Sequence, residues 1–141
     1  MPKPAVHFFS EETQFVLKNK TVLRAWLLDM IVAEGYGLEE LNFIFCSDEY
    51  LLRINQQFLD HDTYTDVITF DHSERLKMIH GDIFISIDRI RENASGLKVR
   101  TDDELHRVMA HGTLHLLGYK DKTKADKLKM TAREDHYLSQ R

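Results

Sequence analysis

The order of hydrophobic segments predicts an α/β or α+β fold, in which helices pack against a sheet. Apolar residues repeat at helical spacing over residues 20–34 and again over 101–118. Short runs rich in β-branched and aromatic residues lie between them, at 41–46, 67–70 and 83–87. A helix–strand–helix–strand–strand series of this kind is typical of a sheet covered by helices.

The first part of the chain is predicted to contain two strands and a helix. Residues 6–9 form a short first strand, and the helix over 20–34 stops at Gly35. The run at 41–46 has little polar alternation, so we expect a strand buried on both faces. Ser47 then has the side chain of a helix N-cap.

The middle of the chain alternates between helix, polar connection and strand. We expect a helix from residue 47 to 58, a polar connection over 60–66, a strand at 67–70, a polar turn over 71–77, a strand at 83–87 opened by residues 80–82, and a short helix over 88–94 that ends at Ser95 and Gly96.

The helix over residues 101–118 is predicted to be the central helix of the core. Apolar residues occur nearly all round it, which indicates burial on every side. Thr101 and Glu104 have the spacing of a capping box at its start. Thr123 and Asp126 have the spacing of a second one, which begins a final amphipathic helix.

A candidate metal site lies at the end of this central helix. His111 and His115 are four residues apart and therefore share one helix face. Gly118 can adopt the left-handed conformation that ends a helix, after which the chain can bring Asp121 to the two imidazoles. Two imidazoles and a carboxylate suit one zinc ion per chain, with a fourth position open for water, as in catalytic sites. The alternative is two histidines that bind backbone or carboxylate partners at a helix end.

The residue after the first histidine restricts the chemistry. The spacing of the three ligands is that of metzincin proteases, which have a glutamate as general base where this chain has Gly112. Glycine there instead permits close backbone packing. Hydrolysis by a water that the metal activates remains possible, and a phosphodiester suits it because the metal also offsets charge on phosphate oxygens.

Composition indicates a globular protein without a membrane segment. With 141 residues we expect one domain, residues 1–141, around one core. No apolar run is long enough to span a membrane, and the start of the chain has no export signal, so we expect a cytoplasmic protein. The single cysteine, Cys46, lies among apolar residues and is interpreted as a buried thiol.

The charge is unevenly distributed along the chain. The net charge is −4 overall. Residues 1–96 have 9 Lys and Arg against 16 Asp and Glu, whereas residues 97–141 have 10 against 7. Basic residues near the candidate site could attract phosphate, or could simply be solvated on exposed helix faces. They are Lys98, Arg100, Arg107, Lys120, Lys122 and Lys124.

Residues 111–119, His-Gly-x-Leu-His-Leu-Leu-Gly-Tyr, resemble the signature of the YbeY family, bacterial endoribonucleases also called rRNA maturation factors. Ile54, Asn55 and Phe58, then residues 65–70 and 81–83, follow the family's order and spacing, so the resemblance covers about residues 41–135. It implies a mixed four-stranded sheet with helices on its faces. It also implies zinc-dependent cleavage of single-stranded RNA in small-subunit ribosomal RNA processing and ribosome quality control.

Two departures from the family pattern concern the site. The family usually has histidine where this chain has Asp121, which should make a bound zinc a weaker Lewis acid and favour manganese, nickel or iron somewhat more. Many members have arginine where this chain has Leu59. His61 or the lysines near residue 120 are candidates to supply that positive charge.

Further polar residues have two interpretations each. Asp66 and Asp82 either orient the two ligand histidines or cap strand ends. The remaining histidines have no spacing that recruits them to a site, and we expect exposed or core positions for them; they are His7, His72, His80, His106 and His136.

Three functions follow as hypotheses. The first is a metal-dependent endoribonuclease whose partner is ribosomal RNA or the small ribosomal subunit. The alternative is a ribosome-assembly binding factor in which the metal is mainly structural, suggested by Asp121 and Leu59. A metallopeptidase rests on ligand spacing and is disfavoured by Gly112.

Overall fold

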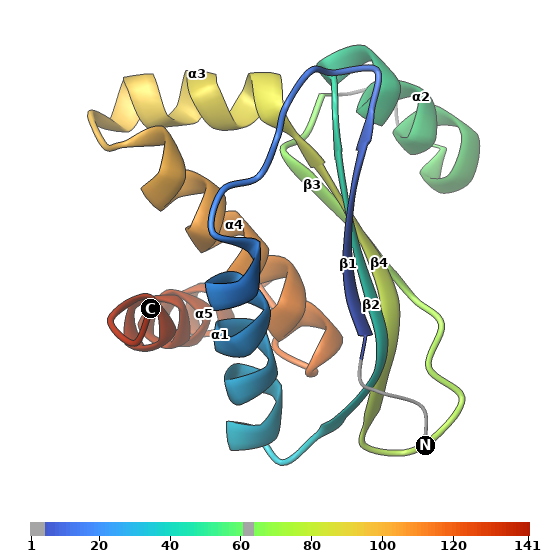
Figure 1. Cartoon of the computed structure of the whole chain (residues 1–141), viewed down its shortest axis with the longest axis vertical. Helices are drawn as coiled ribbons and strands as arrows, with labels where there is room; N and C mark the ends of the chain where they lie inside the picture. The colour runs from blue at the N-terminus through green and yellow to red at the C-terminus, as the bar shows by residue number, and fades with distance from the viewer. Residues whose placement is uncertain (1–4, 61–63) are drawn as a thin grey trace.

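The computed structural model describes residues 5–60 and 64–141, which form an α+β fold with one mixed sheet (Figure 1). The strand order is β1-β2-β4-β3. β1 is parallel to β2 and β2 to β4, whereas β3 is antiparallel to β4. The strands are β1 (Ala5–Glu11), β2 (Gly37–Cys46), β3 (Val67–Asp71) and β4 (Met78–Ser86). The predicted fold class and the mixed four-stranded sheet are confirmed.

The helices lie on both sides of this sheet. Figure 1 shows α1, α4 and α5 on one side and α2 on the other. Their bounds are α1 (Lys20–Ala33), α2 (Asp48–Leu59), α3 (Ile87–Leu97), α4 (Thr101–Leu116) and α5 (Lys124–Leu138). Among the described residues, no helix has both the length and the apolar character needed to cross a membrane.

Helix α4 is the central helix of the core, as predicted. Met109, Ala110 and Leu114 are fully buried, and they belong to one cluster with side chains of α1 and the sheet. A Cβ atom at Gly112 would lie 2.9 Å from Cγ2 of Ile83 on β4. Glycine therefore lets α4 approach the sheet closely, and the candidate ligands on this helix are held by the core.

Strand β2 is less buried than the sequence predicts. Leu41, Phe43 and Phe45 are fully buried beneath the helices of one side. Asn42 and Ile44 point to the other face and are half-buried, because α2 covers one end of that face and packs on β3 and β4.

Some predicted boundaries were wrong. β4 begins at Met78 rather than at residue 83, so Asp82 lies inside the strand. α3 includes Gly96 and ends at Leu97, because the residue that adopts the left-handed conformation (φ 57°) and ends the helix is Lys98. Thr101 is the first helical residue of α4 rather than its cap; the N-cap is Arg100.

Other predicted caps are confirmed. The side chain of Ser47 accepts a hydrogen bond from the backbone N–H of Tyr50, which begins α2. Thr123 and Asp126 form the predicted capping box at the start of α5. The buried face of α5, which includes Met130 and Glu134, packs towards α4.

Candidate metal centre

His111 and His115 lie one turn apart at the C-terminal end of α4. Their ring centroids are 4.6 Å apart and the rings are nearly perpendicular, at 82°. The helix then ends with Gly118 in the left-handed region (φ +100°), and the N–H of Tyr119 donates to the carbonyl of Leu114 at 3.0 Å. This turn reverses the chain and leads it back to the two imidazoles.

Asp121 follows the turn and completes the group that the sequence predicts. Its Oδ2 lies 3.3 Å from Nε2 of His111 and 3.4 Å from Nε2 of His115. All three side chains are partly buried and offer ligand atoms within 4.8 Å of one another. In the described part of the chain, this is the group of histidines and carboxylates that meets the spacing of a metal site.

The distances fit a tetrahedral ion better than they fit hydrogen bonds. Both exceed the usual N–H···O range of about 2.7–3.2 Å. A tetrahedron with bonds of about 2.05 Å, the length typical for zinc with nitrogen and oxygen ligands, has edges of about 3.3 Å. The Nε2 and Oδ2 atoms are therefore spaced like neighbouring ligands of one ion.

Glu134 on α5 holds the ring of His111 from behind. Its Oε2 lies 2.7 Å from Nδ1 of His111, and its side chain is 8% exposed. The other carboxylate oxygen accepts a hydrogen bond from Nη1 of Arg107 at 2.8 Å, and Nη2 of Arg107 donates to Asp135 at 2.6 Å. With Nδ1 donating its proton to Glu134, the lone pair of His111 Nε2 faces Asp121.

The same contact changes the basicity of His111. Burial lowers the pKa of the imidazole, but the hydrogen bond to Glu134 and the negative charges of Glu134 and Asp121 outweigh it, so the pKa is raised. A more basic imidazole is a stronger ligand for a metal. The environment of His111 therefore favours binding of a cation.

Sequence reasoning missed Glu134, although a signal for it was present. Met130, Glu134 and Tyr137 are the buried residues of α5, at spacings of four and three. A glutamate in an apolar stripe needs a buried partner. That pattern, read together with the capping box at Thr123, would have directed Glu134 towards the core.

The two aspartates with open interpretations have different environments. Asp66 precedes β3 and accepts backbone hydrogen bonds there, which agrees with a strand-end cap. Burial raises its pKa, and its charge interacts with His111. Asp82 has neither expected role. It lies within β4 and accepts hydrogen bonds from Asn42 at 3.0 Å and from His72 at 3.0 Å, on the other face of the sheet.

The basic residues near the site are only partly available to a ligand. Arg107 forms ion pairs with Glu134 and Asp135. Lys120 is exposed and directly precedes Asp121. Leu59 is the last residue of α2 and is 43% exposed. His61, considered as a replacement for the missing arginine, lies outside the described residues.

Cys46 is a buried thiol, as predicted, and it does not belong to the candidate site. Its thiol is fully buried, and burial together with the negative charge of Asp48 raises the pKa to about 12. A thiol with this pKa is protonated at neutral pH and neither ligates nor attacks readily.

The fold and the site together define a class: α+β proteins that gather two histidines and a carboxylate at the end of a buried helix, the donor set of a metal-dependent hydrolase. The family model described as "Endoribonuclease YbeY" matches residues 7–141. The chain belongs to the YbeY family.

Individual relatives extend this similarity over nearly the whole chain. The endoribonuclease YbeY of Cytophaga hutchinsonii is 55% identical over 141 residues, which cover 100% of this chain and 99% of the relative. That of Flavobacterium psychrophilum is 52% identical over 130 residues, 92% of each chain. The solution structure of TM1509 from Thermotoga maritima superposes with a TM-score of 0.67 at 27% identity, covering 95% of this chain and 87% of that one.

Proposed function

We propose that this chain is a metal-dependent endoribonuclease that cleaves single-stranded RNA in ribosomal RNA maturation and ribosome quality control. The names of its relatives support endoribonuclease activity. The observation that carries the metal dependence is the convergence of Nε2 of His111, Nε2 of His115 and Oδ2 of Asp121, with spacings of 3.3 and 3.4 Å to the carboxylate oxygen.

The proposed cofactor is one zinc ion per chain, with another divalent transition metal as the alternative. His111, His115 and Asp121 would hold it. When bound, such an ion supplies Lewis acidity towards a water molecule and the phosphodiester. The carboxylate gives the site a charge of −1, which offsets part of the charge of a divalent ion.

The chain's own residues determine orientation and access. Glu134 fixes the ring of His111, and Arg107 fixes Glu134. The imidazole of His111 and the carboxylate of Glu134 are therefore in place before a cation binds. Gly112 is packed against Ile83 and leaves no space for the glutamate of a metallopeptidase. This packing argues against the metallopeptidase alternative.

One experiment on the purified protein tests the proposal. Metal content and cleavage of a single-stranded RNA are measured on the same preparation, for the wild type, for His115→Ala and for His7→Ala as an exposed control. We expect about one metal per chain and RNA cleavage in the wild type and in the control, and loss of both in His115→Ala. Absence of stoichiometric metal together with unchanged cleavage by His115→Ala would refute the proposal.

The same variants separate the ribosome-assembly alternative. If the metal is mainly structural, His115→Ala lowers the melting temperature but leaves binding of RNA or ribosomal protein intact, and the wild type cleaves no RNA. The nuclease proposal expects the opposite pattern, in which cleavage disappears while the fold persists, since the His115 side chain is 28% exposed and does not belong to the buried core.

The proposed partner is ribosomal RNA, free or within the small ribosomal subunit. The proposed location is the cytoplasm, because bacterial ribosomal RNA is processed there. We also propose that residues 1–141 act as one domain, because α4 contacts α1, α3, α5 and the sheet.

A further inference from the structure

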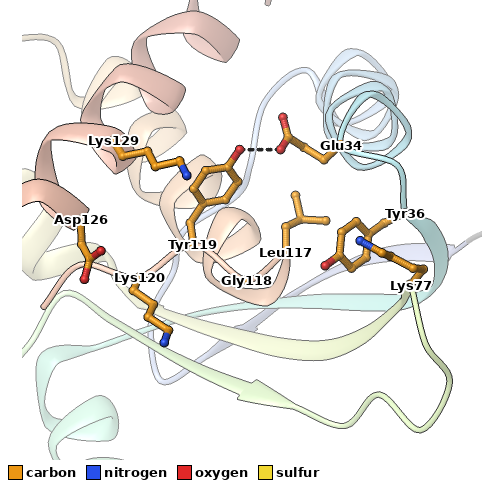
Figure 2. Close-up of a pocket in the computed structure, with 9 residues that line it drawn as sticks. All are labelled: Glu34, Tyr36, Lys77, Leu117, Gly118, Tyr119, Lys120, Asp126 and Lys129. Atoms are coloured by element: carbon orange, nitrogen blue, oxygen red, sulfur yellow. Dashed lines mark hydrogen bonds between the residues drawn. The ribbon is translucent and has the colours of Figure 1, made fainter.

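A cavity lies beside the turn that ends α4, the same turn that leads the chain to Asp121. It has a volume of about 350 Å³. Its walls come from the end of α1, the turn before β4, residues 117–120 and the first turns of α5 (Figure 2). Asp121 directly follows the wall residues 117–120 in the chain, so the cavity and the candidate metal centre share the turn that ends α4.

Two tyrosines and three lysines give the cavity its chemistry. Figure 2 shows the rings of Tyr36 and Tyr119 on either side of Leu117. Nζ of Lys77 lies 4.5 Å from the centre of the Tyr36 ring, and Nζ of Lys129 lies 5.7 Å from that of Tyr119. Lys120 is the third lysine. Aromatic rings that stack bases and amines that neutralise phosphate are the components of a single-strand nucleic-acid site.

The lysines are available because the two carboxylates of the cavity have closer partners, although the charge of Lys120 still acts on Asp126. Glu34 accepts hydrogen bonds from the hydroxyls of Tyr119, at 2.6 Å, and of Tyr137. Asp126 belongs to the capping box of α5 and accepts the N–H of Thr123 at 3.2 Å. Among the described residues, no ion pair includes the amine of Lys77, Lys120 or Lys129.

The backbone keeps Tyr36 and Lys77 in place from both ends of the cavity. The N–H of Gly37 donates to the carbonyl of Lys77 at 2.8 Å, which joins the start of β2 to the turn before β4. The hydroxyl of Tyr36 lies 3.9 Å from the position that a Cβ atom of Gly118 would occupy. Tyr36 therefore bridges that turn and the end of α4, and a preformed site costs less ordering when a ligand binds.

We propose that this cavity binds one nucleotide of the RNA strand next to the scissile position, with its base against Tyr36 or Tyr119 and its phosphate near Lys77, Lys120 and Lys129. The inference rests on the proposed endoribonuclease function and adds a substrate subsite to it. A volume of about 350 Å³ is within the range of small-ligand pockets, about 300–1,000 Å³. The subsite extends substrate contact beyond the three candidate ligands.

The test measures RNA binding with catalysis silenced. A fluorescein-labelled single-stranded RNA of about 12 nucleotides is titrated with protein in EDTA at several salt concentrations. The test variant is Lys77→Gln/Lys129→Gln. The control is Lys18→Gln/Lys20→Gln, which removes the same charge at the start of α1. The cavity lies at the other end of this helix, which has 14 residues and is therefore about 20 Å long.

Loss of two phosphate contacts has a measurable signature. We expect the test variant to bind RNA about tenfold more weakly at physiological salt, and the slope of log affinity against log salt to fall by about 1.4 relative to the control. Tyr36→Ala should weaken RNA binding at least about fivefold. Tyr36→Phe should bind RNA like the wild type, since the phenyl ring still stacks. Affinity and slope equal to those of the control would overturn the proposal.

The subsite and the nuclease function fail in different ways. A wild type that cleaves RNA, with a test variant that binds RNA like the control, overturns the subsite alone. A wild type that binds RNA through Lys77 and Lys129 but shows no cleavage with any added divalent metal overturns the nuclease alone. Melting temperatures of all variants show whether a loss of binding reflects unfolding.

Discussion

Oε2 of Glu134 lies 2.7 Å from Nδ1 of His111, although 23 residues separate the two in the chain. The contact joins α5 to the end of α4. Nη1 of Arg107 donates a hydrogen bond to the other carboxylate oxygen of Glu134 at 2.8 Å. A carboxylate that holds a ligand histidine fixes its tautomer and its direction. This contact therefore fixes the orientation of His111, one of the two candidate ligand histidines, before any cation binds.

The first prediction concerns this carboxylate. Glu134→Gln keeps the size of the side chain but removes the charge that makes His111 more basic and that pairs with Arg107. We expect metal affinity to fall about 10- to 100-fold, as is usual for loss of such a partner. Competition with a chromophoric chelator measures it. Asp135→Asn is the control, because Asp135 also pairs with Arg107 but does not contact His111.

A metal affinity of Glu134→Gln equal to that of Asp135→Asn would show that Glu134 only supports the packing of α5. Urea unfolding of both variants in chelator separates this outcome from a general loss of stability. In that case the negative charge of Glu134 does not contribute to metal binding.

The second prediction concerns the glycine between the helix and the sheet. In Gly112→Ala the new methyl group would lie 2.9 Å from Cγ2 and 3.1 Å from Cδ1 of Ile83. We expect a loss of about 1–3 kcal/mol in the free energy of unfolding, the usual cost of overpacking a core. Gly96→Ala is the matched control, since nothing lies within 4 Å of its Cβ position.

Gly96→Ala should instead stabilise the protein by about 0.5–1 kcal/mol, because alanine loses less conformational freedom than glycine in a helix. Urea denaturation measures both variants. Equal effects of the two substitutions would mean that α4 does not approach β4 as closely as described.

Local patterns predicted the elements and the three candidate ligands, and long-range contacts explain most of the rest. The spacing of His111 and His115 and the glycine stop after them are properties of one short segment, so sequence was enough to bring Asp121 to them. Glu134 reaches His111 through the packing of two helices, which no local pattern contains. The capping box expected at Thr101 was wrong, because Thr101 is itself helical with Arg100 as the N-cap, and Glu104 is buried at 7% exposure rather than at the helix surface.

The third prediction is a pH dependence of stability at Glu34. Burial would raise the pKa of this carboxyl, but hydrogen bonds from Tyr119 and Tyr137 outweigh it and hold the pKa below 4.5. A lowered pKa in the folded state stabilises the protein fully above the pKa of the unfolded state, and this contribution disappears as the pH falls through the folded value.

We therefore expect the wild type to be more stable than Glu34→Gln at about pH 7 and to lose this advantage only below about pH 4.5. Urea unfolding in chelator at several pH values gives the difference. Glu74→Gln, an exposed glutamate in the turn before β4, is the control and should show no such pH dependence. An advantage that grows on acidification would contradict the assignment.

The last prediction concerns Asp121, where the resemblance to the YbeY family leads us to expect a histidine. If Asp121 is the third ligand, Asp121→Ala removes one of three bonds and metal binding should fall by at least about 100-fold, whereas Asp29→Ala, an exposed aspartate on α1, should not change it. Asp121→His should retain or tighten binding, because a neutral imidazole also ligates zinc and leaves the ion a stronger Lewis acid. Isothermal titration with zinc measures all three. Clear loss of binding in Asp121→His would mean that the 3.3 and 3.4 Å contacts of its carboxylate are hydrogen bonds to the histidines rather than the edges of a metal site.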